Sequence, residues 1–170
     1  MLRLTDVAET TDICREFEFM GVGLILLRVT SEEKISSSYH WLLEDGRKPG
    51  LDVSFSPTNG NMVYMKFFLQ DEKVKADSVE ISATELQGLP VFDTSDWNED
   101  QYYLSENGDV IPMFDGKNLY LIRTGHTSSI CVRTGQSFSM LFSTDNTFSG
   151  AIFHDVNTEE IQSLKDAGML

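Results

Sequence analysis

The stretch LDVSFSPTNGNMVYMKFFL, residues 51–69, carries the clearest structural signal in the chain. Apolar side chains occupy alternate positions on both sides of the turn sequence Asn59-Gly60-Asn61. Alternation with a period of two is typical of strands that bury one face. Asn-Gly adopts the positive φ angles that a tight hairpin turn requires. The stretch therefore predicts two antiparallel strands, over residues 51–56 and 62–69, joined by a short turn.

The same kind of pattern extends over most of the chain. Gly21 and Gly23 interrupt the first apolar run, which predicts one or two strands there. Asn107-Gly108 and Asp115-Gly116 predict two further hairpins. Further strands are expected over residues 18–29, 39–43, 101–104, 110–114, 118–123, 129–133, 137–143 and 147–154.

Helix signals occur only near the two ends. Asp6 and Glu9 have the spacing of a capping box, which predicts a short helix near the N-terminus. Asn157 and Glu160 repeat this spacing before an apolar pattern that ends at Gly168, which predicts a C-terminal helix. Residues 74–90 fit either a strand or a helix.

Successive strands with short links favour an antiparallel meander, because a parallel sheet needs longer crossover connections. We therefore expect an α+β fold that is predominantly antiparallel β. It would contain about ten short strands, in a sandwich or a strongly curved sheet, with a short helix near each terminus. The chain has 170 residues and no repeat, low-complexity tract or linker, so we expect a single globular domain over residues 1–170.

The chain is strongly acidic, with 13 Lys and Arg against 27 Asp and Glu and a net charge of -14. Nucleic-acid affinity depends largely on Lys and Arg, which displace counterions, so we expect no direct nucleic-acid binding. Anionic membrane surfaces repel the chain in the same way, and no membrane contact is expected. The charge favours the basic surface of a protein partner.

The negative charge is concentrated between Ala76 and Gly116. This stretch of 41 residues holds ten acids and no Lys or Arg, so it supplies ten of the 14 net negative charges. Its centre, DTSDWNEDQYY at residues 93–103, places aromatic side chains among four carboxylates. Carboxylates steer a basic partner, and aromatic anchors supply much of the binding energy of interfaces.

We therefore predict a partner-binding surface in this segment. Its candidate residues are Asp93, Asp96, Trp97, Glu99, Asp100, Tyr102, Tyr103, Glu106 and Asp109. The alternative is a solvated loop in which Trp97 and one tyrosine turn into the core.

Residues that often carry catalysis form no recognisable motif. His126 and Ser128 make one His-x-Ser, but a two-histidine phosphoesterase needs a second copy. Cys131 lies five residues from His126, which puts the two on opposite faces of a strand. His154 and Asp155 are adjacent, and adjacent strand residues also point apart. We expect a protein that is not an enzyme.

No cofactor or metal site is expected either. The acids of residues 93–100 lack the alternating ligand positions and the glycine of an EF-hand, and the histidines and cysteines lack zinc-type spacing. Cys14 and Cys131 are expected to be reduced and buried, although the sequence also allows a disulfide between them. Two basic and five acidic residues up to Phe19 do not fit a secretory signal, so we expect a cytoplasmic location.

These observations predict an intracellular acidic protein that masks a basic protein partner. The most concrete version is an immunity (antitoxin) protein that neutralises a cationic nuclease toxin. The chain resembles such immunity proteins only in size and charge. One alternative is a β-domain that binds a small ligand or sugar, and another is an enzyme with an unrecognised site. In the first alternative, the cavity for the small ligand or sugar would be lined by Tyr39, Trp41, Phe55, Tyr64 and Phe67. The sequence predicts no oligomeric state.

Overall fold

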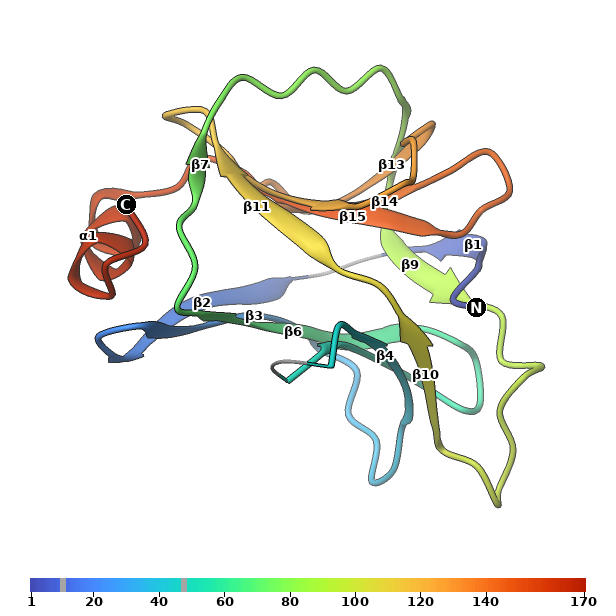
Figure 1. Cartoon of the computed structure of the whole chain (residues 1–170). Helices are drawn as coiled ribbons and strands as arrows, with labels where there is room; N and C mark the ends of the chain where they lie inside the picture. Colours follow the sequence, from blue (N-terminus) through green and yellow to red (C-terminus); the bar gives the residue numbers. More distant parts are fainter. Residues whose placement is uncertain (10–11, 47–48) are drawn as a thin grey trace.

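Two large β-sheets lie face to face in the computed structural model, which describes residues 1–9, 12–46 and 49–170 (Figure 1). The strands, in chain order, are β1 (Leu4–Ala8), β2 (Ile13–Gly21), β3 (Leu24–Ser31), β4 (Tyr39–Glu44), β5 (Leu51–Phe55), β6 (Met62–Gln70), β7 (Lys75–Ala76), β8 (Thr84–Gln87), β9 (Leu89–Phe92), β10 (Tyr103–Asn107), β11 (Val110–Phe114), β12 (Leu119–Arg123), β13 (Ile130–Thr134), β14 (Phe138–Phe142) and β15 (Phe148–Phe153). Helix α1 spans Thr158–Asp166.

The six-stranded sheet has the order β10-β4-β5-β6-β3-β2, and the seven-stranded sheet has the order β7-β11-β12-β15-β14-β13-β8. Strands β1 and β9 pair separately at one end of the sandwich (Figure 1). Most neighbours are antiparallel, and the β10–β4, β7–β11 and β8–β13 pairs are parallel. The predominantly antiparallel β architecture is confirmed.

The inner faces of the two sheets share one hydrophobic core. Trp41 of β4 packs edge-on against Phe148 of β15, with 5.4 Å between ring centroids, and Phe17 of β2 packs at the same distance against Phe153 of β15. Aromatic pairs in this geometry contribute about 0.5–1.5 kcal/mol beyond their area burial. These contacts join strands that lie far apart in the sequence.

The hairpin predicted from residues 51–69 is confirmed. Strands β5 and β6 pair antiparallel, with Phe55 opposite Met62. Gly60 has a φ of 76°, and a Cβ there would collide with the backbone of Phe92. Its carbonyl accepts a hydrogen bond from Phe92 N–H at 2.8 Å, so this turn also holds β9 in place.

The predicted N-terminal helix is wrong. Residues 4–8 form β1, which pairs with β9, and residues 13–21 form β2, which pairs with β3. Along β2, Cys14 is exposed while Arg15 and Phe17 turn inward, so the period is two. Pairing with strands distant in sequence outweighs the local spacing of Asp6 and Glu9. The expectation of a buried Cys14 is wrong for the same reason, and both cysteines are free.

The hairpin predicted at Asn107-Gly108 is also wrong. The chain crosses there from one sheet to the other, because β10 pairs with β4 whereas β11 pairs with β12. Gly108 is needed for close approach, since a Cβ would lie 2.8 Å from the Leu43 Cδ1 atom. The turn at Asp115-Gly116 does join two antiparallel neighbours, as predicted.

Residues 77–83, here called the strap, cross the outer face of the seven-stranded sheet (Figure 1, top). The strap joins β7 at one edge of that sheet to β8 at the other, so the helix considered for residues 74–90 is absent. Val79 and Ile81 pack against a small apolar cluster on the sheet. That cluster contains Tyr120, Leu141 and Ile152.

Helix α1 is the predicted C-terminal helix. Asn157 and Glu160 form both hydrogen bonds of a capping box, at 2.8 and 3.0 Å. The Glu160 carboxylate also pairs with the largely buried Arg15 guanidinium of β2, with 2.7 Å between Oε1 and Nη2. Arg15 further donates to the carbonyl of Ser137 at 2.8 Å and to that of His154. One arginine therefore joins β2, the helix and the seven-stranded sheet.

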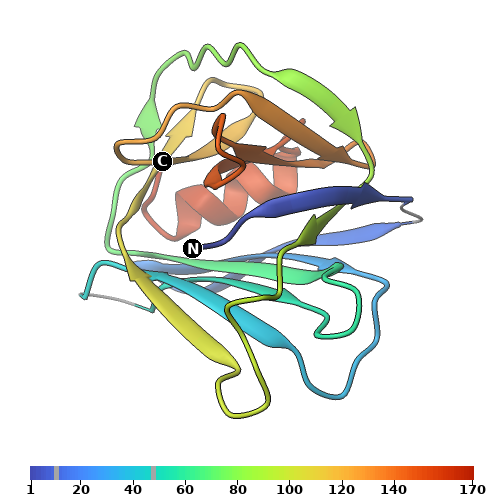
Figure 2. The ribbon, with the colours of Figure 1, turned by 90° about the vertical axis from the view of Figure 1, so that its right-hand side faces the viewer.

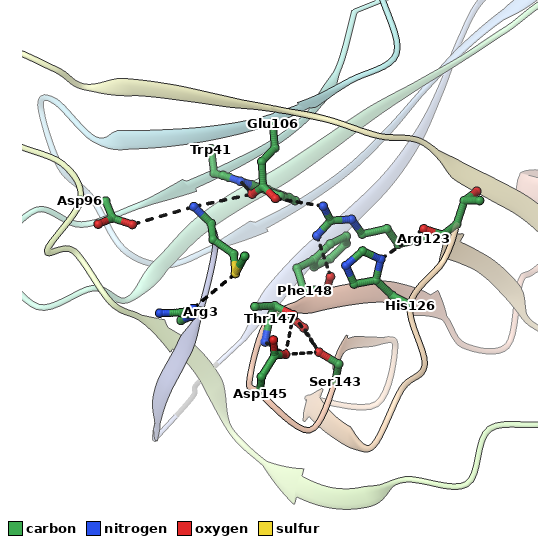
Figure 3. Close-up of polar contacts among 12 residues, drawn as sticks. Arg3, Trp41, Asp96, Glu106, Arg123, His126, Ser143, Asp145, Thr147 and Phe148 are labelled. Carbon is green, nitrogen blue, oxygen red and sulfur yellow. Dashed lines mark hydrogen bonds and ion pairs between the residues drawn. The ribbon is translucent and has the colours of Figure 1, made fainter.

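A second buried arginine joins the sheets at the other end of the sandwich (Figure 3). Arg123 of β12 is 5% exposed, and its guanidinium donates to Glu106 Oε1 and to the Phe148 carbonyl, both at 3.1 Å. The guanidinium also lies 5.5 Å from the Trp41 ring centroid. Glu106 accepts a further hydrogen bond from Trp41 Nε1 at 2.7 Å.

Replacing Glu106 by glutamine should lower the free energy of unfolding by about 3 kcal/mol, because the Arg123 charge stays buried without its counter-charge. Urea unfolding followed by tryptophan fluorescence measures the loss. Glu99→Gln is the matched control, since Glu99 is exposed, and it should stay within about 0.5 kcal/mol of the unchanged protein. Equal losses for the two variants would contradict a role of this ion pair in holding the sheets together.

Candidate binding surface

Residues 93–102, here called the acidic loop, join β9 to β10 and project beyond the six-stranded sheet (Figures 1 and 2). Short-range hydrogen bonds shape the loop. Asp93 Oδ1 accepts from Ser95 N–H at 2.9 Å, and Asn98 Oδ1 accepts from Asp100 N–H at 2.8 Å. The hydrogen bonds from Ser95 lower the pKa of the Asp93 carboxyl. Asp93 therefore keeps its negative charge at pH values below those at which an aspartate is usually protonated.

Trp97 fixes this loop to the body of the protein. Its side chain is 5% exposed, and its Nε1 donates to the His40 carbonyl at 2.9 Å. The ring packs edge-on against Phe55, with centroids 4.9 Å apart, and lies over Tyr39. Tyr102 also turns inward and packs against Tyr39 at 5.3 Å. Trp97 and Tyr102 therefore hold the loop and leave its carboxylates outside.

Tyr103, the first residue of β10 after the acidic loop, presents its aromatic ring to solvent. Its side chain is 60% exposed, and its ring stacks on the imidazole of His40 at 4.3 Å with an interplanar angle of 7°. The parallel pairing of β10 with β4 places these two residues opposite each other. The stack holds the phenol ring in one orientation at the surface.

A hydrogen-bonded network below Tyr103 orients the histidine. His40 Nδ1 lies 3.0 Å from Asp52 Oδ1, and the Tyr64 hydroxyl donates to Asp52 Oδ2 at 2.8 Å. Burial, with the Asp52 charge second, raises the pKa of the Tyr64 phenol above its usual value. Tyr64 therefore remains a donor, and Asp52 remains available to His40.

Four of the predicted residues belong to one short exposed segment, here called the docking face. Its members are Asp96, Glu99, Asp100 and Tyr103. All four are exposed, and all lie within residues 96–103. Asp96 also lies 3.9 Å from the Met1 amino group (Figure 3).

Glu106 and Asp109 are half-buried and are not counted in the docking face, although the Met1 amino group lies 3.9 Å from Asp96 and 3.6 Å from Glu106. Glu106 belongs to the Arg123 network (Figure 3). Burial acts to raise the pKa of its carboxyl, but hydrogen bonds from Trp41 and Arg123 outweigh this and lower it. Asp109 is half-buried at the crossing between the sheets, where its carbonyl accepts from Thr124 N–H at 3.1 Å.

The histidines and cysteines considered for catalysis have other partners. His126 Nδ1 lies 3.2 Å from the Thr124 carbonyl, and Ser128 shares a hydrogen bond of 2.8 Å with Ser149. Burial raises the pKa of the Cys131 thiol, which disfavours a reactive thiolate. His154 Nε2 lies 2.7 Å from Ser139 Oγ.

Among the described residues, no group of three or more His, Cys, Asp and Glu side chains is arranged to hold a metal ion. Within the same part of the chain, no helix has the length and apolar character needed to cross a membrane.

Comparison with known proteins adds no relative to this picture. No protein-family model matches the chain. A search of curated proteins also finds no matching sequence.

Sequence reasoning missed the support beneath Tyr103. His40, Asp52 and Tyr64 come from three different strands, β4, β5 and β6, and only the register of those strands brings them together. One feature of the sequence could have indicated this network. In each strand these residues alternate with core residues, which places all three side chains on the outer face of the six-stranded sheet.

His154 should give the protein a distinctive dependence of stability on pH. Burial is the main cause that lowers its pKa to about 4, and Arg133 adds to this, whereas Asp155 and Glu85 oppose it. The unfolded chain protonates this histidine near 6.5, so it binds more protons than the folded state between about pH 6.5 and 4. The stability that neutral His154 contributes is therefore complete above that window and is lost as the pH falls through it.

His154→Gln should flatten this part of the stability curve, because glutamine keeps a polar partner for Ser139 and does not titrate. Urea unfolding at pH 7.5, 6.0, 5.0 and 4.5 (roughly spanning the window) measures the difference between the two proteins. The same measurement on His126→Gln is the control and should show little change. Parallel curves for His154→Gln and the unchanged protein would contradict the assignment.

Proposed function

We propose that this protein binds a basic protein partner through the docking face and masks the basic surface of that partner. The observation that carries the proposal is the exposed Tyr103, held rigid on His40 at the end of a short segment with three exposed carboxylates. A pre-oriented tyrosine loses little conformational entropy on binding, and tyrosine is enriched among the residues that dominate interface energies.

The charges around Tyr103 suit a basic surface. Asp96, Glu99 and Asp100 lie in the segment without Lys or Arg, and the Met1 amino group, 3.9 Å from Asp96, is the cation that the structure places beside one of them. Exposed pairs contribute only about 0–1 kcal/mol each, but together they speed association and select against acidic partners. The tyrosine supplies contact area, and the carboxylates supply steering and selectivity.

Cationic nucleases are the most concrete class of partner. Such enzymes carry basic surfaces because they bind phosphate backbones, and those surfaces are complementary to a cluster of carboxylates. An immunity protein that covers the nucleic-acid site of a toxin would act in this way. The chain would then inhibit the partner without any catalytic group of its own.

Affinity capture from lysate of the source organism, followed by binding measurements on the captured protein, tests the proposal. Tyr103→Ala should weaken the complex about 30-fold, the loss typical of an interface anchor. The triple variant Asp96→Lys, Glu99→Lys, Asp100→Lys should abolish capture, and association of the unchanged protein should slow as salt is raised. If the partner is a nuclease, the protein should inhibit it in proportion to the complex formed.

A second triple variant is the matched control. Asp77→Lys, Glu80→Lys and Glu85→Lys make the same change in net charge in the strap and β8, on the other side of the sandwich (Figure 1). This variant should still capture the partner. Equal capture by both triple variants, or equal loss in both, would refute the docking face.

A further inference from the structure

Strand β2 forms one end of the six-stranded sheet, and among the described residues no strand pairs with its edge away from β3 (Figure 1). It has nine residues, whereas the strands at the other three ends of the two large sheets, β10, β8 and β7, have five, four and two. In an antiparallel pair, every second residue of an edge strand turns its backbone N–H and C=O away from the neighbouring strand. Of these four strands, β2 therefore presents the longest open row of backbone hydrogen-bonding groups.

Apolar side chains are exposed at the end of β2 that leads into β3. Phe17 faces the core and packs on Phe153 of β15. Phe19, two residues further on, belongs to the same face of the strand but is 46% exposed. Met20, at 50%, and Val22, at 87%, follow at the turn. An extended segment beside β2 would remove part of this apolar surface from water, which is favourable.

The outer face of β2 carries a net negative charge. Glu16 and Glu18 are 47% and 45% exposed, and both pair with the Arg28 guanidinium of β3. One arginine thus meets two carboxylates. Arg15 adds no positive charge to this face, because its guanidinium turns inward and pairs with Glu160. Opposite charges on adjacent strands stabilise their pairing, so basic side chains on an incoming strand are complementary to this face.

The same charges disfavour a second copy of this chain as the occupant. Two β2 strands side by side would bring four carboxylates, Glu16 and Glu18 of each copy, onto one face of adjoining strands. Like charges across strands are destabilising, and the net charge of -14 on each copy adds to the repulsion.

We propose that the open edge of β2 binds an extended segment of a partner protein in which basic and apolar residues alternate. The backbone of the segment extends the six-stranded sheet by one strand. Its basic side chains face Glu16 and Glu18, and its apolar side chains lie beside Phe17 and Phe19. Strand β10, which begins at Tyr103, is the opposite end of the same sheet, so this site is separate from the docking face and does not depend on the proposed function.

Fluorescence anisotropy with a fluorescein-labelled peptide of alternating lysine and valine, as long as β2, tests the site in the full chain. We expect saturable binding with a dissociation constant on the order of 10 μM. A peptide with glutamate in place of each lysine should show no binding. Equal affinity of the two peptides would overturn the proposal.

The double variant Glu16→Gln, Glu18→Gln should weaken binding of the lysine peptide about fivefold, since each exposed pair contributes little. Both side chains are exposed, so the fold should be retained. The matched control is Glu99→Gln, Asp100→Asn, which removes the same charge from the docking face and should leave the affinity unchanged. Equal weakening by the two double variants would overturn the proposal, because attraction to net charge would then account for the binding.

Amide hydrogen exchange distinguishes strand addition from contact between charges alone. The bound peptide should slow exchange at every second amide of β2, which are those that face the open edge. The amides that already bond to β3 should not change. The amides of β8, an edge strand of the other large sheet, serve as an internal reference. Unchanged exchange throughout β2 at saturating peptide would overturn the proposal.

Sedimentation of the protein without peptide tests the alternative occupant. We expect a monomer over the concentrations used for the titration. A dimer that shows slowed exchange at alternate amides of β2 in the absence of peptide would overturn the proposal, since a second copy would then fill the edge.

Discussion

Arg123 brings a full positive charge to the contact between the two sheets, and the surrounding residues are arranged to compensate for it. Glu106 supplies the opposite charge, Phe148 supplies a carbonyl, and the Trp41 ring lies alongside the guanidinium. Removing any one partner leaves a buried polar group unsatisfied, which costs more than the hydrogen bond itself contributes. Arg15 joins the two sheets in the same way at the other end of the sandwich, with Glu160 as its counter-charge. The two networks fix the position of one sheet on the other. The acidic loop and the strap are attached to these sheets, so their positions depend on the same two networks.

The two arginine networks also affect the outer surface. Each buried arginine is paired with a buried or half-buried glutamate, so the two pairs cancel in the interior. The net charge of -14 is then carried by the remaining residues, most of which face solvent. Trp97 contributes to this separation, because it anchors the acidic loop from below while the carboxylates stay outside. The docking face therefore combines exposed carboxylates with one fixed aromatic ring, which a polar network supports from below.

Local sequence signals predicted the elements whose stabilising contacts are themselves local. The Asn59-Gly60 turn and the Asn157–Glu160 capping box involve residues a few positions apart, and both were predicted. The same types of signal failed at Asp6–Glu9 and at Asn107-Gly108, where partners from β9, β3 and β4 decide the outcome. The acidic loop was found from composition alone. Composition could not show that Trp97 and Tyr102 turn inward whereas Tyr103 turns outward, because that depends on the register of β10 against β4.

The two ends of the strap have a further consequence for the seven-stranded sheet. The strands that it joins, β7 and β8, are the outermost strands of that sheet, with two and four residues. They cover the longer strands β11 and β13, whose outer backbone groups would otherwise be open to a strand from another molecule. Short edge strands next to charged residues are a common protection against aggregation through edge-to-edge pairing. One continuous segment thus covers both edges of the seven-stranded sheet against pairing with a strand from another molecule.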